Sequence, residues 1–162
     1  MPTSTAPTGF GRPIWNAIKG GNQVHGVGLT PVTVRVQGAN ANFSRAVFMA
    51  PASATGGFWK VESAKIISDT TISAEGSNYW KFSLKVAGDF MGDELATTSV
   101  LTLNTAYDLD VKGPESTTPK NVFLAAGDLL YLNGDKVTGS SVDTSGIDFG
   151  IQVLLRHSPP GR

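Results

Sequence analysis

Apolar and polar residues alternate along much of this chain, and that pattern predicts β-strands rather than helices. The longest regular alternation lies in 78–87, and a second one lies in 147–157. Successive side chains of a strand point to opposite faces of a sheet, so an alternating segment buries one face and exposes the other. We therefore expect the apolar positions of both segments to share one core. These positions are Trp80, Phe82, Leu84, Val86, Phe149, Ile151, Val153 and Leu155.

Shorter segments of the same kind predict further strands between residues 31 and 132. Glycine, proline, asparagine and aspartate residues separate them, as expected for tight turns. The separations leave no room for crossover helices, which favours antiparallel sheets. The segment 90–97 is the best candidate for a helical turn. The predicted strands are 31–37, 44–50, 58–68, 98–103, 121–124 and 128–132.

Together these segments predict an all-β protein, namely an antiparallel β-sandwich that is jelly-roll-like and has about eight strands. The first thirty residues lack the alternation and are rich in proline, glycine, serine and threonine. We therefore expect an extended N-terminal arm before the sandwich. The predicted divisions are an arm over 1–30, a β-sandwich domain over 31–157 and a C-terminal tail over 158–162.

A short apolar cluster interrupts the arm and supplies its candidate contact residues. Pro13, Ile14, Trp15 and Ile18 stand in a segment that lacks the pattern to fold alone. Burying a Trp or an Ile gains roughly 1.5–3 kcal/mol, so such residues favour a covered position. Two interpretations stay open: Trp15 packs on the core of its own domain, or the arm docks on a neighbouring subunit or partner. We predict the second, with Trp15 as the anchor.

Composition narrows the function classes. The chain has 13 Lys and Arg against 13 Asp and Glu, a balance that argues against binding nucleic acid mainly through phosphate contacts. No apolar run approaches the ~18 residues that span a bilayer, and the N-terminus has no signal-peptide pattern. With no cysteine, disulfides, Cys-ligated zinc and thiol nucleophiles are excluded. We expect neither a nucleic-acid partner nor a membrane partner.

Residues suited to catalysis or metal binding are sparse. His25 lies in a glycine-rich stretch and His157 at a strand end, and neither a nucleophile elbow nor a phosphate-binding loop is present. Asp108 and Asp110 share one face of an extended segment, which could serve Ca²⁺, although aspartate capping of turns is the commoner explanation. A glycosidase pair from distant carboxylates stays open. We predict a non-enzymatic protein without cofactor or metal.

Three turn-and-strand motifs carry a resemblance to a known family. They are 57–64 (GFWKVESA), 75–84 (EGSNYWKFSL) and 125–132 (AAGDLLYL). They resemble small β-sandwich virion proteins of tailed bacteriophages, in which a Gly-x-Asn-Tyr-Trp turn opens a central strand and a Gly-Asp turn opens a late one. The resemblance extends over residues 43–157 and consists of turn chemistry and alternation, which unrelated β-sandwiches share.

The resemblance implies a structural virion protein without catalytic residues. Its leading form is a capsid decoration, or cement, protein that stabilises the shell by binding across subunits of the major capsid protein. It implies a homo-oligomer, a trimer in preference to a dimer, on the outer capsid surface after synthesis in the host bacterial cytoplasm. Alternatives are another tail or baseplate structural protein, or a receptor- or glycan-binding head or tail fibre module. Candidate tip aromatics for a fibre module are Phe43, Phe58, Trp59 and Tyr107.

Overall fold

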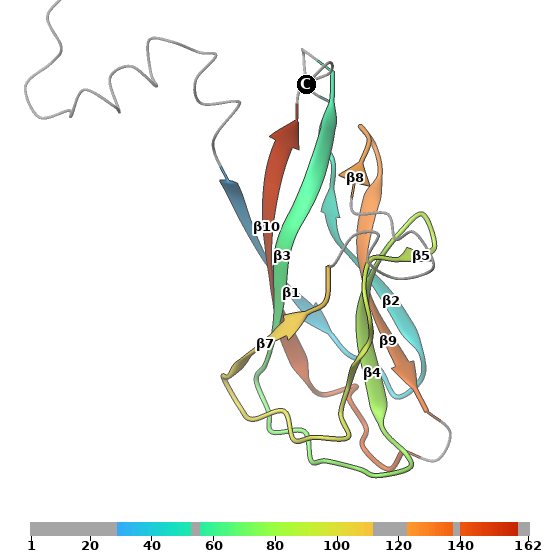
Figure 1. Cartoon of the computed structure of the whole chain (residues 1–162). Helices are drawn as coiled ribbons and strands as arrows, with labels where there is room; N and C mark the ends of the chain where they lie inside the picture. Colours follow the sequence, from blue (N-terminus) through green and yellow to red (C-terminus); the bar gives the residue numbers. More distant parts are fainter. Residues whose placement is uncertain (1–28, 53–55, 112–122, 138–139, 159–162) are drawn as a thin grey trace, which may run out of the picture.

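The computed structural model describes residues 29–52, 56–111, 123–137 and 140–158. These residues form ten β-strands and no helix. The strands make two antiparallel sheets of five strands each, which face one another as a β-sandwich (Figure 1). The all-β antiparallel sandwich predicted from the alternation is therefore confirmed. In the described parts of the chain, no helix long and apolar enough to cross a membrane is found.

Each sheet has one path of four strands and one further short strand. The first sheet consists of β1 (Leu29–Gln37), β10 (Asp148–Ser158), β3 (Phe58–Ser68) and β7 (Ala106–Leu109), with β8 (Phe123–Leu124) also beside β3. The second sheet consists of β2 (Phe43–Met49), β9 (Leu129–Lys136), β4 (Trp80–Val86) and β5 (Asp89–Phe90), with β6 (Leu95–Ala96) also beside β4.

Strand pairing is nested, with early strands beside late ones. β1 pairs with β10, and β2 pairs with β9. β3 pairs with both β7 and β8, and β4 pairs with both β5 and β6. β10 also lies beside β3, and β9 lies beside β4. This order is that of a jelly roll, if β5 with β6 and β7 with β8 each count as one interrupted strand. The jelly-roll-like expectation of about eight strands is confirmed in that sense.

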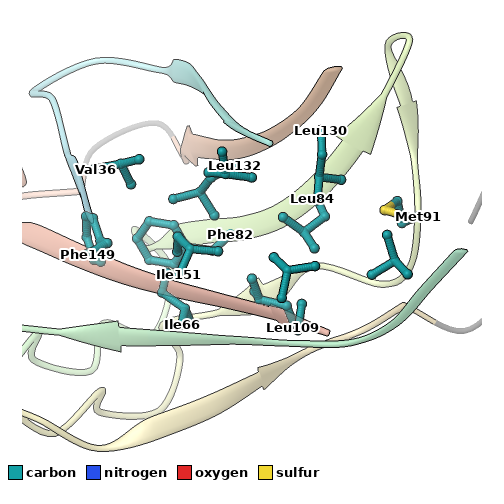
Figure 2. Packing of buried hydrophobic residues seen from close by; sticks show 14 of the residues in the cluster. Val36, Ile66, Phe82, Leu84, Met91, Leu109, Leu130, Leu132, Phe149 and Ile151 are labelled. Carbon is teal, nitrogen blue, oxygen red and sulfur yellow. The ribbon is translucent and has the colours of Figure 1, made fainter. Parts of the chain in front are cut away.

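The core lies between the facing sides of the two sheets (Figure 2). All the apolar residues that alternation predicted for it in β4 and β10 are buried. The rings of Phe82 and Phe149 lie 5.0 Å apart between centroids and join the two sheets, while Trp80 stacks on Phe82 at 6.2 Å. A shift of one residue would have turned Lys81 and Lys85 inward, so the predicted register is confirmed.

Two predictions between β4 and β7 are wrong. The segment 90–97 forms no helical turn, because the chain reverses after β4 and both β5 and β6 then extend beside it. The segment 98–103 forms only a single bridge, in which Leu101 and Ile72 exchange backbone hydrogen bonds of 2.9 and 3.0 Å. β7, which was not predicted, takes the place beside β3. Alternation shows which side chains are apolar but not which strand is free to pair.

The turns before β4 and β9 lie where the sequence motifs placed them. Residues 76–78 bend directly before β4. Ahead of β9, Gly127 adopts a φ of 88°, and the N–H of Asp128 donates to the carbonyl of Ala125 at 3.0 Å. Glycine adopts such a φ without steric cost, which explains the tight entry into the strand.

Candidate partner-binding surfaces

Two aspartates other than Asp108 and Asp110 hold turns through backbone hydrogen bonds. The Asp143 carboxylate accepts the N–H of Ser145 at 2.8 Å, and this backbone hydrogen bond lowers the pKa of Asp143. The Asp128 carboxylate accepts the N–H of Ala125, also at 2.8 Å. Aspartates commonly stabilise turns by bonds of this kind.

Asp108 and Asp110 each have a separate contact. Asp108 forms an ion pair with Nζ of Lys65 at 2.8 Å on the surface of the first sheet. The Asp110 carboxylate accepts the N–H of Asp93 at 2.8 Å. Among the described residues, no three His, Asp or Glu side chains are grouped so as to hold a metal ion. Both carboxylates therefore have structural contacts.

His157 lies at the end of β10, as expected for a strand-end residue. Its ring is 5.1 Å from that of Trp59, and Nε2 lies 3.1 Å from the carbonyl oxygen of Gly56. These contacts tie the ends of β3 and β10 together. The other histidine, His25, lies outside the described residues.

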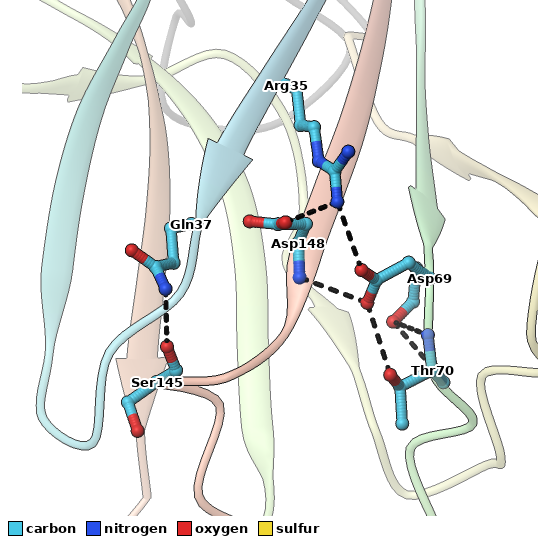
Figure 3. A network of polar contacts seen from close by, with 7 residues as sticks. Arg35, Gln37, Asp69, Thr70, Ser145 and Asp148 are labelled. Atoms are coloured by element: carbon cyan, nitrogen blue, oxygen red, sulfur yellow. Dashed lines mark hydrogen bonds and ion pairs between the residues drawn. The ribbon is translucent and has the colours of Figure 1, made fainter.

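At the other end of the first sheet, away from His157, a polar network connects β1, β3 and β10 (Figure 3). Arg35 of β1 forms an ion pair with Asp148, and it lies 3.5 Å from Asp69, just after β3. Asp69 in turn accepts the N–H of Asp148 at 3.0 Å and the hydroxyl of Thr70 at 3.1 Å. Exposed ion pairs contribute at most about 1 kcal/mol, so the network chiefly orients the outermost strand.

The four candidate tip aromatics divide into buried and exposed residues. Phe43 is buried in the core, so its assignment to an exposed tip is wrong. Tyr107 is half-buried, and its hydroxyl is hydrogen-bonded to the backbone of the loop at 100–102. Trp59 is half-buried, whereas Phe58 beside it is largely exposed. Only Phe58 therefore presents most of a ring to a partner.

Three exposed apolar side chains lie on the outer face of the first sheet, with Arg156 and Lys60 between Leu29 and the other two. Cross-strand register places Leu29 beside Arg156, Arg156 beside Lys60 and Lys60 beside Phe123. Leu29 is 43% exposed and Phe123 46%, and Phe58, two residues before Lys60 on β3, is 51% exposed. We call Leu29, Phe58 and Phe123 the outer apolar patch. Sequence reasoning missed the patch because its residues come from strands that are far apart in the chain. The signal that could have found it is a large apolar residue at a position of a strand that faces solvent.

β1 also leaves an open backbone edge. β10 lies on one side of it, and no described strand lies on the other. The N–H of Gly38 donates to Ile147 at 2.9 Å, so the N–H groups of Thr33 and Arg35, in the other phase, point away from β10. Pro31 is in that outward phase, where its missing N–H costs no ladder bond. Another chain can therefore add a strand at this edge.

The predicted arm contacts, Pro13, Ile14, Trp15 and Ile18, lie outside the described residues. The structure does show where the arm joins the sandwich. β1 begins at Leu29, which is itself part of the outer apolar patch and of the open edge. The arm thus starts where the two candidate surfaces meet.

No protein-family model matches the chain, and no curated protein matches it significantly. Evidence about its function therefore comes from the fold and from these surfaces.

Proposed function

We propose that this chain is a structural protein of a tailed-phage virion, which decorates and stabilises the capsid by binding across subunits of the major capsid protein. The observation that carries the proposal is the meeting of an open strand edge and an exposed apolar patch at the start of β1. Surfaces that are broad and extended suit a large protein partner, whereas small-molecule sites are concave and enclosed.

The topology supports this proposal by analogy. Jelly rolls occur in viral capsid domains and in lectin domains. Fold alone does not assign function, so the turn motifs before β4 and β9 add the connection to phage β-sandwich proteins. The supporting features are therefore the fold class, the motifs and the two surfaces taken together.

The mechanism would be one of thermodynamic linkage. A protein that binds the assembled shell but not the free subunits lowers the free energy of the shell. Repetition over many subunit joints lets a modest affinity at each site resist the pressure of packaged DNA. Assembly of the chain into a homo-oligomer, with a trimer preferred to a dimer, would increase the number of contacts made by each decorating unit.

Copy number on purified particles tests the proposal. Virions of the phage that encodes this sequence are purified, and the chain is quantified against the major capsid protein by mass spectrometry. We expect hundreds of copies in each particle and labelling of intact heads by antibodies against the chain. A count of tens or fewer, confined to the tail, would overturn the proposal in favour of a tail, fibre or baseplate protein. Absence of the chain from particles would overturn a virion role altogether.

A second candidate, a receptor- or glycan-binding fibre module, is favoured by one observation. Phe58 is 51% exposed at the start of β3, and an exposed aromatic ring of this kind can stack on a ligand. If this candidate holds, the purified chain binds host cells, and Phe58→Ser abolishes that binding. The matched control Val100→Ser, at a similarly exposed position outside the patch, leaves the binding unchanged.

A further inference from the structure

Among the described residues, the edge of β1 differs from the other sheet edges, which are protected against pairing. The far edge of the first sheet consists of β7 and β8 and that of the second sheet of β5 and β6, and none of these strands has more than four residues. β2, the remaining edge, has a bulge between Ala46 and Phe48 and carries the charged Arg45 on the same face as the buried Phe43. Short strands, bulges and inward-pointing charges are the features that keep an edge from adding another strand.

β1 has none of these three features. It pairs with β10 over all nine of its residues without a register shift. At its middle, the N–H groups of Thr33 and Arg35 point away from β10. Pro31 lacks an N–H but stands nearer one end of the strand, so the central donors remain. β1 is therefore the long, regular edge of this sandwich.

The inward-facing side chains of β1 show that a neighbour on this side would gain apolar contacts. Val32 and Val34 pack against the core but remain half-buried, whereas Val36 is fully buried. β-branched residues pack best when they have cross-strand neighbours. A strand added beside β1 would cover the open sides of Val32 and Val34 and remove their apolar surface from water.

The sequence of β1 is complementary to itself in one antiparallel register. If Thr33 lies opposite Thr33 of a second copy, all nine residues are paired, and Leu29 lies opposite Gln37. The two threonines then exchange both of their outward hydrogen bonds, and each proline costs only one bond further along. On the inward face, Val32 of each copy lies opposite Val34 of the other. Threonine pairs and pairs of β-branched residues across two strands are stabilising.

Charge favours the same register. A pairing centred on Arg35 would place two guanidinium groups directly opposite each other, which is destabilising. In the register centred on Thr33, the two Arg35 residues are four positions apart along the strand, or about 14 Å. That separation exceeds the Debye length of about 8 Å at physiological ionic strength. Each Arg35 also keeps its ion pair with Asp148 of its own chain.

We propose that the free protein forms a two-fold dimer in which the β1 strands of two copies pair antiparallel about Thr33. The two first sheets then join into one continuous sheet. Because a two-fold contact occupies the same edge on both copies, the assembly closes at two, which differs from the trimer that the resemblance favours. The inference concerns the free chain and does not rest on the proposed function. On a particle, an extended segment of the capsid protein would compete with the second copy for this edge.

Disulfide trapping tests the register. Because the chain has no cysteine, the variant Thr33→Cys carries a single thiol. The Cα atoms of a hydrogen-bonded antiparallel pair are about 5.5 Å apart, within the roughly 7 Å that a disulfide allows. Gln37→Cys is the matched control, since it is also exposed and in the outward phase of β1, but its two Cα atoms would be about 27 Å apart.

At micromolar protein and under mild oxidation, we expect Thr33→Cys to form a covalent dimer at least tenfold faster than Gln37→Cys. Non-reducing gels measure both rates. Equal rates would indicate random collision and overturn the proposal, and so would the lack of a covalent dimer with Thr33→Cys.

A proline at position 33 tests the backbone contact itself. Thr33→Pro removes the N–H that makes the two central bonds between the copies, but leaves the ladder with β10, because this N–H points away from β10. The loss of two hydrogen bonds should raise the dimer Kd about tenfold or more. Thr33→Val keeps both the N–H and the branched side chain, so it should leave the dimer Kd unchanged. Circular dichroism checks that each variant is folded.

Sedimentation equilibrium of the full chain at tens of micromolar measures these constants. A monomeric or trimeric wild type, or an unchanged dimer Kd in a folded Thr33→Pro variant, would overturn the proposal. If Thr33→Pro does not fold, the rates of the two cysteine variants and the size of the wild type decide. None of these measurements uses particles, so failure of the dimer and failure of the proposed function are distinguishable.

Discussion

At the scale of single residues, the turn between β4 and β5 holds a residue in a costly conformation. Val86 pairs with Asp89, so Ala87 and Gly88 form a two-residue loop, with φ values of 51° and 89°. This is the pattern of a type I′ hairpin, which favours Asn-Gly. A left-handed φ costs an alanine residue about 1 kcal/mol or more of conformational free energy, whereas asparagine adopts this conformation more readily.

We therefore predict that Ala87→Asn raises the free energy of unfolding by about 0.5–1 kcal/mol. Urea denaturation monitored by tryptophan fluorescence would show a higher midpoint with an unchanged slope. The same substitution at Ala46, exposed on β2 at a position without positive φ, should be neutral or slightly destabilising. A gain of equal size at both positions would contradict the explanation by backbone conformation.

Glu75 holds the segment 140–141 through its carboxylate. Its carboxylate accepts hydrogen bonds from the hydroxyls of Ser141 and Ser140, and these bonds lower the pKa of Glu75. A carboxylate with a lowered pKa stabilises the fold above its unfolded pKa, and that contribution is lost as pH falls through the folded value.

We predict that Glu75→Gln destabilises the protein near neutral pH and that the difference from the wild type shrinks as pH falls below about 4.3, the usual pKa of glutamate. Thermal melts between pH 3 and pH 7 measure this convergence. A difference that stays constant over the whole range would show that the charge of Glu75 is not what holds the 140–141 segment.

At the scale of strands, one glycine allows an aromatic layer to form. Gly134 of β9 lies opposite Phe43 of β2 on one side and Phe82 of β4 on the other. A Cβ at Gly134 would overlap the ring of Phe43. That ring lies 5.9 Å from Trp80 and 6.5 Å from Phe149, so it has no free space to enter.

We predict that Gly134→Ala lowers the free energy of unfolding by about 1–3 kcal/mol, as overpacking of a filled core does. Chemical denaturation measures the change. Gly76→Ala is the matched control, because a Cβ there would meet nothing within 4 Å and φ is not positive. It should stay within about 0.5 kcal/mol of the wild type. A tolerated Gly134→Ala would mean that Phe43 can repack.

At the scale of the whole molecule, the arm and the sandwich should be separable. The strands and the connections between them supply the buried cluster that holds the two sheets together. We predict that deleting residues 2–19 leaves the sandwich folded, with a melting temperature within a few degrees of the full chain, and sharply weakens attachment to particles. Circular dichroism and co-sedimentation with stripped particles measure the two effects.

Deleting only residues 2–9 is the control, because it keeps the apolar cluster at Pro13–Ile18. That shorter deletion should retain attachment. If the longer deletion unfolds the domain, Trp15 belongs to the core of its own chain. If the longer deletion binds as tightly as the full chain, the sandwich surfaces alone attach the protein.

The sequence by itself determined the class of fold and the inward face of its main strands. The bounds of β3 follow from its Val, Ile and aromatic residues and from the turn residues after it. The buried phases of β4 and β10 follow from alternation, because a period of two is a local property of the chain. Turn chemistry likewise located the entries into β4 and β9, since a positive φ at Gly127 depends on one residue.

Only the tertiary structure decided which strands pair and which surfaces stay open. β7, and not the segment 98–103, lies beside β3. Phe43 points inward opposite Gly134. Leu29 and Phe123 lie at the two ends of one cross-strand row. Each of these depends on contacts between segments far apart in the chain, and local alternation carries no information about such partners. The outer apolar patch and the open edge of β1 are therefore properties of the folded jelly roll, invisible in any single segment.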